Sequence, residues 1–134
     1  MNRICILMTL YSFFLCSCAE EKIRPDDALG TARSFIRFSL DGNYKEAKTL
    51  MLQDSLNNFE LDELEKRYNS KLSESEKEGY KNASILIHSV DQISDSVVII
   101  NYSNSYKKKP MPVKVILKDG FWQIDLNYTF SGNL

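Results

Sequence analysis

The spacing of apolar residues changes near residue 82, and this change predicts two kinds of secondary structure. Before that point Leu, Ala and Phe recur every three or four positions among charged residues, as on the buried stripe of an amphipathic helix. After it, β-branched residues dominate and apolar positions alternate with polar ones, as in strands that bury one face. The pattern therefore predicts helices in the first half of the chain and strands in the second.

The first helix is expected at residues 28–40, the segment ALGTARSFIRFSL. Pro25 and the acids Asp26 and Asp27 stand before it, where the free amides and the dipole of a first turn favour them. Gly42 follows it, and Gly is the usual residue for a left-handed helix cap.

Two more helices are predicted after this cap. Asn43 can cap a short helix at 44–51, the segment YKEAKTLM. A third helix is expected from about Ser55 to Gly79, and its polar later half, SKLSESEKEGY, should be exposed or frayed. The apolar stripe of this helix consists of Leu61, Leu64, Tyr68 and Leu72.

Four strands are predicted in the second half. They are ASILIHSV (83–90), SDSVVIINYS (94–103), PVKVILK (112–118) and FWQIDLNY (121–128). Asp119-Gly120 predicts a tight hairpin between the last two strands. The expected fold class is therefore α+β, with N-terminal helices packed on a four-stranded antiparallel sheet, because the apolar face of such a sheet needs a cover.

Residues 1–17 have the layout of a secretory signal peptide. One positive charge, Arg3, precedes an apolar run that ends at Leu15, and small or thiol residues follow. The run is about a dozen residues, whereas a helix that crosses a bilayer needs roughly 20. We expect a signal peptide at 1–17, a tether at 18–25 and a single domain at 26–130, since the remaining length suits one domain.

The segment Leu15-Cys16-Ser17-Cys18 resembles the bacterial lipobox. The resemblance implies cleavage before Cys18 and acylation of that residue, which would anchor the chain in a membrane. Ala19 then implies the outer membrane of a Gram-negative bacterium, and Glu20-Glu21 leaves export to the cell surface open. An ordinary cleaved signal, an uncleaved anchor, or a metal or disulfide role for the cysteines are the alternatives. A thiolate metal site would need more ligands, and the single His of the chain, His88, lies far away, so no metal or cofactor is expected.

The charge of the chain disfavours nucleic acid as a partner. It has 17 basic and 18 acidic residues, and Arg3 is lost with the signal peptide, so the remaining part has a formal charge of about −2. The basic run 107–109 (KKK) is expected to form a solvated hairpin loop or to guard a sheet edge. Contact between this run and acidic headgroups or an acidic partner is the alternative.

Two longer stretches resemble bacterial lipoprotein domains of unknown function with the nuclear transport factor 2-like, or cystatin-like, fold. These stretches are ARSFIRFSLDGNYKEAKTLM and VKVILKDGFWQIDL, and the likeness spans about residues 26–128. The matching motifs are Gly-x-Tyr-x-x-Ala at Gly42, Tyr44 and Ala47, and Asp-Gly-x-Trp-x-Ile at Asp119, Gly120, Trp122 and Ile124. The resemblance implies a cone-shaped fold with a pocket between sheet and helices, and a homodimer that packs through its sheets.

Few side chains are candidates for catalysis in such a pocket. His88 and Asp125 are the weak ones, and Asp125 alternates with apolar neighbours that should face the core. The expected pocket wall consists of Phe35, Tyr44, Tyr102 and Trp122. The expected function is a non-catalytic, lipid-anchored binding module of the cell envelope that contacts a protein partner or itself. A carrier of a small apolar ligand, or an enzyme that uses the pocket, is the alternative.

Overall fold

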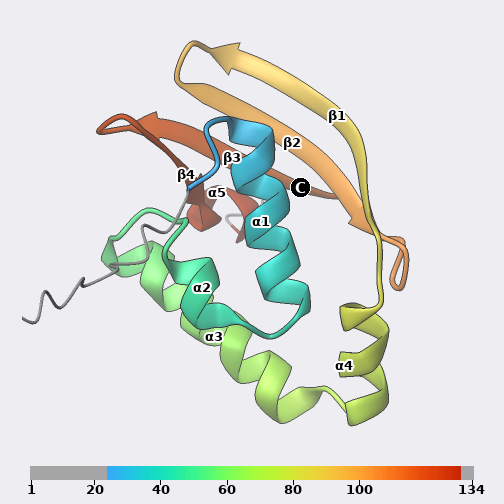
Figure 1. Cartoon of the computed structure of the whole chain (residues 1–134). Helices are drawn as coiled ribbons and strands as arrows, with labels where there is room; N and C mark the ends of the chain where they lie inside the picture. The colour runs from blue at the N-terminus through green and yellow to red at the C-terminus, as the bar shows by residue number, and fades with distance from the viewer. Residues whose placement is uncertain (1–23, 131–134) are drawn as a thin grey trace, which may run out of the picture.

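The computed structural model describes residues 24–130, in which helices precede a four-stranded antiparallel sheet (Figure 1). The helices of the first half are α1 (Ala28–Leu40), α2 (Tyr44–Lys48), α3 (Ser55–Lys71) and α4 (Glu74–Lys81). The strands are β1 (Ile85–Ser94), β2 (Val97–Asn104), β3 (Met111–Lys118) and β4 (Phe121–Asp125), and a short helix, α5 (Leu126–Phe130), follows them. The strands pair in chain order, so the α+β prediction is confirmed. The predicted signal peptide and Cys18 lie outside the described residues.

Helix α1 lies across one face of the sheet and covers its core (Figure 1). Asp27 caps its first turn through a side-chain bond to the Gly30 amide, and Gly42 follows its end with a φ of 75°. Both ends therefore agree with the prediction. The core beneath it comprises Ala32, Phe35, Ile36 and Leu40 of α1 and Val98, Ile100, Val113, Val115 and Ile124 of the sheet. Each large apolar side chain buried here stabilises the fold by about 1.5–3 kcal/mol.

The predicted single helix from Ser55 to Gly79 is wrong, because the chain breaks between α3 and α4. Leu72 has extended backbone angles, φ −89° and ψ 135°, and Ser73 starts a new helix. Ser73 and Glu76 form a capping box, in which each side chain binds the backbone amide of the other residue. In a continuous helix these two amides would donate to carbonyls four residues earlier, but here they donate to side chains. The chain therefore starts a new helix, α4, at this point.

The second helix is shorter than predicted, because residues 50–52 pair with β4. The Leu52 amide donates to the Ile124 carbonyl at 3.0 Å, and the Ile124 amide donates to the Leu50 carbonyl at 2.9 Å. Met51 lies between them and is 1 % exposed. The backbone bonds that would extend α2 are thus replaced by bonds to the sheet edge.

The last strand also ends earlier than the alternating pattern predicts. It stops at Asp125, and the chain turns into α5 at Leu126. The side chain of Asn57, which is 2 % exposed, accepts a hydrogen bond from the Leu126 amide at 2.6 Å. The start of α3 therefore satisfies the first amide of α5. None of the helices in residues 24–130 is long and apolar enough to cross a bilayer.

Candidate functional site

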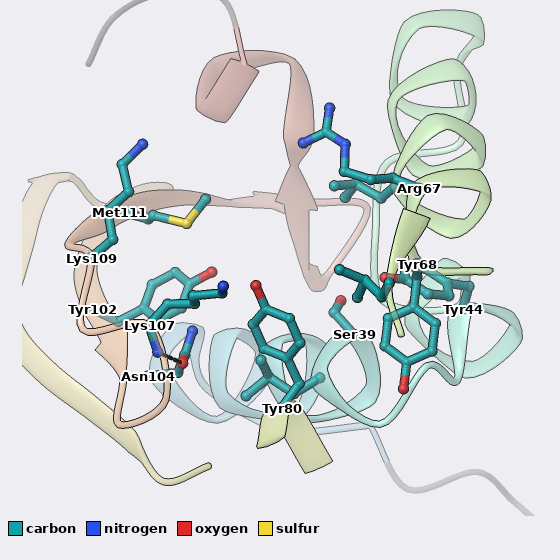
Figure 2. A pocket seen from close by; sticks show the side chains of 13 residues that line it. Ser39, Tyr44, Arg67, Tyr68, Tyr80, Tyr102, Asn104, Lys107, Lys109 and Met111 are labelled. Atoms are coloured by element: carbon teal, nitrogen blue, oxygen red, sulfur yellow. Dashed lines mark hydrogen bonds between the residues drawn. The ribbon is translucent and has the colours of Figure 1, made fainter. Parts of the chain in front are cut away.

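A cavity of about 470 Å³ opens between the helices and one end of the sheet (Figure 2). Its lining comes from every helix of the first half, from β2 and β3, and from the loop between these strands. The lining residues are Ser39, Leu40, Tyr44, Leu64, Arg67, Tyr68, Leu72, Tyr80, Tyr102, Asn104, Lys107, Lys109 and Met111. A smaller space of about 100 Å³ shares Ser39, Tyr44, Leu64, Tyr102 and Met111 with it and reaches Phe35.

Arg37 holds α4 against α1 at the side of this cavity. Its guanidinium donates to the carbonyls of Tyr80 and Lys81, at 3.2 and 3.1 Å, and to that of Ala83 at 2.8 Å. It also forms an ion pair with Asp41 at 2.9 Å. A cation at the carbonyl end of a helix satisfies free acceptors and opposes the helix dipole. Because α4 contains no buried residue, this contact is a main determinant of where Tyr80 lies.

Edge-to-face contacts between tyrosines fix the aromatic walls. The rings of Tyr80 and Tyr106 lie 5.1 Å apart, and those of Tyr44 and Tyr68 lie 5.7 Å apart. Gly79 makes the first contact possible, since a Cβ at this position would lie 2.5 Å from the Tyr106 ring. The aromatic side chains thus join α4 to the loop after β2, and α2 to α3.

The loop between β2 and β3 is held by Asn104. The Asn104 carboxamide oxygen accepts from the amides of Tyr106 and Lys107, at 3.1 and 2.9 Å, and the Asn104 carbonyl accepts from the Lys108 amide at 2.8 Å. Lys108 takes a positive φ of 56°. The loop is exposed, as predicted for the basic run, but Lys107 and Lys109 also line the cavity and flank its mouth.

The ionisable side chains that line the cavity are cations and phenols. Among the residues that line it, Arg67, Lys107 and Lys109 are cationic, and none carries a carboxylate or an imidazole. Burial raises the pKa of Tyr102 to about 12. Burial, followed by the neighbouring Tyr68, also raises the pKa of Tyr44 well above its ordinary value. Both phenols are therefore protonated near neutral pH and can donate hydrogen bonds.

The predicted pocket wall is only partly correct. Tyr44 and Tyr102 line the main cavity, and Phe35 lines its inner extension. Trp122 lines neither space. It packs on the core from β4, where it pairs with Leu117. Strand alternation gave the face on which Trp122 lies correctly. It could not show whether that part of the face borders the cavity.

Both catalytic candidates lie outside the cavity. Tyr102 points into the cavity, so Ser103 points to the opposite face of the sheet, where His88 Nε2 lies 2.8 Å from Ser103 Oγ. Asp125 follows the buried Ile124 and pairs with Lys114 at 3.3 Å. The prediction that Asp125 faces away from the core is therefore confirmed. The structure brings neither candidate together with the phenols or with Phe35.

Two side chains of the site on helices were not predicted. They are Arg67 of α3 and Tyr80 of α4, although Tyr68 and Leu72 stood on the predicted stripe that includes α3. The segment NYSNSYKKK supplies Tyr102, Asn104, Lys107 and Lys109, but it gives no signal for the two helical side chains.

Residues 24–130 contain no group of three or more His, Cys, Asp and Glu that could hold a metal ion. Comparisons with protein-family models, with curated proteins and with solved structures each found no match. The likeness to nuclear transport factor 2-like lipoprotein domains therefore stays a prediction that rests on the quoted motifs, and the function has to be inferred from the cavity itself.

Proposed function

We propose that this chain is a non-catalytic binding domain of the bacterial envelope that holds a small ligand in the cavity between its helices and its sheet. The observation that supports the proposal is the open space of about 470 Å³, which falls in the range of small-molecule sites. Leu40, Leu64 and Met111 give it apolar walls, and a few hydroxyl and basic groups converge on it. Such a lining is typical of ligand sites.

The chemistry of the lining favours binding over catalysis. General acid–base catalysis needs a group with a pKa near the working pH inside the site. The pKa values of the Tyr44 and Tyr102 phenols are raised further above neutral pH. The two predicted acid–base candidates, His88 and Asp125, lie outside the cavity. A carrier or a ligand sensor therefore fits this cavity better than an enzyme.

The proposal includes the fold family and the membrane anchor. A cystatin-like, nuclear transport factor 2-like domain would place a pocket between sheet and helices, where this cavity lies. The lipobox-like segment that ends at Cys18 would tether the domain to the outer membrane, on its periplasmic face or at the cell surface.

Native mass spectrometry of the acylated full chain, extracted gently from its own membrane, tests the proposal. We expect a mass beyond protein and lipid, which would be the retained ligand. Ser39→Phe should remove this excess by filling the cavity. Ser70→Phe is the matched control, because Ser39 and Ser70 both donate to the carbonyl four residues before them, and Ser70 is exposed on α3. An excess mass that persists in Ser39→Phe would contradict the proposal.

A second candidate, self-association, is favoured by the outer face of the sheet. The pairing register places apolar side chains there, namely Leu86, Ile99, Ile116 and Phe121. Leu86 and Phe121 are 44 % and 51 % exposed. Sedimentation velocity should then show a dimer that Leu86→Glu dissociates. A wild-type chain that stays monomeric at high concentration would exclude this candidate.

A further inference from the structure

The cations of the cavity approach its mouth from two sides. Arg67 lines the cavity from α3, whereas Lys107 and Lys109 belong to the loop between β2 and β3, on the other side in Figure 2. Two acids lie near the lining. Glu76 Oε1 is 3.9 Å from Lys107 Nζ. Burial raises the pKa of Tyr44, and the charge of Glu65 adds to this effect. The two acids offset at most two of the three positive charges. The cavity is therefore positive although residues 18–134 carry a formal charge of about −2. A positive cavity in an acidic chain favours an anionic group in the ligand.

The interior of the cavity is apolar. Leu40, Leu64, Leu72 and Met111 line it together with the tyrosine rings. The inner extension of about 100 Å³ adds Phe35, Ile36 and Val113, which belong to the core. A small hydrated anion would lose its water against these walls with little compensation, so the rest of the ligand should be apolar.

Hydroxyl donors lie beside the cationic groups of the cavity. Figure 2 shows the hydroxyls of Tyr80 and Tyr102 and the ammonium of Lys107 pointing into the same space. The Tyr102 hydroxyl, like any phenol of ordinary or raised pKa, is protonated near neutral pH, so it can donate to an anion. Charge-assisted hydrogen bonds of this kind are stronger than bonds between neutral groups.

The backbone that carries these groups is held in place before any ligand arrives. Asn104 binds two backbone amides of the loop that carries the lysines. Arg37 fixes the end of α4 that carries Tyr80. A site that is held in this way loses little conformational entropy on binding.

We infer that the cavity binds an amphipathic anion, whose aliphatic or aromatic body fills the apolar interior and whose carboxylate, sulfonate or phosphate group lies among Arg67, Lys107 and Lys109. This inference rests on the proposed ligand-binding function and names the chemical class of the ligand. It assigns the basic loop a direct role in binding, in addition to its role as the connection between β2 and β3.

A pair of fluorescent probes that differ in one charged group tests the inference on the mature chain. The probes are 8-anilinonaphthalene-1-sulfonate and N-phenyl-1-naphthylamine, which share the aromatic body. We expect the sulfonate to bind roughly tenfold more tightly than the neutral amine, and its affinity to fall as salt is added. If neither probe binds, the proposed function itself fails. If the neutral probe binds as tightly as the sulfonate, the anion inference fails while the proposed function stands.

Variants of the basic loop distinguish direct contacts between its lysines and the sulfonate from the effect of the overall charge of the loop. Lys107→Gln combined with Lys109→Gln should remove most of the preference for the sulfonate over the neutral probe. Lys108→Gln is the matched control for each single substitution, Lys107→Gln or Lys109→Gln, because it removes one charge from the same loop at a position that does not line the cavity. An equal loss of preference in Lys108→Gln would overturn the assignment, since it would indicate a diffuse field.

Competition against the bound sulfonate identifies the source of the anion. Displacement by soluble decanoate indicates a free fatty-acid-like anion. Displacement by phosphatidylglycerol vesicles but not by decanoate indicates a lipid headgroup. Both results support an amphipathic anion. Displacement by decanol at the same concentration as decanoate would contradict it, because decanol has the same chain without the charge.

Discussion

At the scale of single residues, two neighbouring asparagines of α3 have opposite roles in the fold. Asn57 Oδ1 accepts from the Leu126 amide at 2.6 Å, and Asn57 Nδ2 donates to Asp54 at 2.9 Å. The next residue, Asn58, has a buried carboxamide oxygen without a hydrogen-bond partner in the described residues. Their side chains therefore contribute differently to stability, although their type and helix are the same.

Asn57→Ala should destabilise the domain by about 1–3 kcal/mol, because it leaves the buried Leu126 amide without an acceptor. Asn58→Ala is the control and should change stability by less than about 1 kcal/mol, since it removes an oxygen that is already unpaired. Urea unfolding followed by circular dichroism measures both, with the midpoints compared at constant slope. Equal losses in the two variants would refute the role assigned to Asn57.

Tyr68 gives a second prediction at the residue scale. Its hydroxyl is buried and lacks a hydrogen-bond partner within residues 24–130, while its ring packs on Tyr44 and over Gly42. Tyr68→Phe keeps the ring and removes the unpaired hydroxyl, so stability should stay constant or rise by up to about 1 kcal/mol. The same urea titration checks this. A loss above this size would show that the hydroxyl has a partner in solution.

At the scale of elements, α4 depends on contacts that lie outside the helix. It has no buried residue, and Arg37 binds the carbonyls at its end. Arg37→Met should therefore release α4, and its amides should exchange with deuterium roughly 10–100-fold faster, as expected for a loss of a few kcal/mol of local stability. Hydrogen exchange resolved by mass spectrometry measures this effect.

Arg33→Met is the matched control for this prediction. Arg33 lies one helical turn before Arg37 on α1 and is exposed. The substitution removes the same charge from the same helix without touching α4, so exchange in α4 should stay as in the wild type. Unchanged exchange in Arg37→Met would mean that the contact between the rings of Tyr80 and Tyr106 is sufficient to hold the helix.

The elements differ in how far local sequence determines them. The ends of α1 follow from Asp27 and Gly42, and the break before α4 follows from the spacing of Ser73 and Glu76, which a closer reading could have recognised. The turn into α5 could not be predicted in this way. It depends on Asn57, which lies 69 positions earlier in the chain.

The candidate site shows the same division. Tyr44 and Tyr102 were predicted as parts of the pocket wall, and both line the cavity. Tyr80 was not predicted, because its position depends on the bonds from Arg37 to the end of α4. Alternation along a strand gives the face of a side chain, whereas the docking of helices decides which part of that face borders a cavity.

At the scale of the whole molecule, α1 separates the proposed anchor from the cavity. The described chain begins at Arg24, whose guanidinium lies 5.1 Å from the centre of the Phe121 ring at the start of β4. The cavity takes Ser39 and Leu40 from the other end of α1, and a helix of 13 residues is about 20 Å long. The described chain therefore begins at the end of α1 that lies away from Ser39 and Leu40.

This separation predicts that modification at the tether leaves ligand binding intact. Cys18 is the single cysteine of residues 18–134, so the unlipidated mature chain can be coupled there to a bulky maleimide polymer. The Kd for 8-anilinonaphthalene-1-sulfonate should change by no more than about twofold. The same polymer at Lys71→Cys, in a Cys18→Ser background, should weaken binding several-fold, because Lys71 precedes the lining residue Leu72. Equal weakening from both positions would place the tether beside the mouth, and the anchor would then have to be a part of the ligand site.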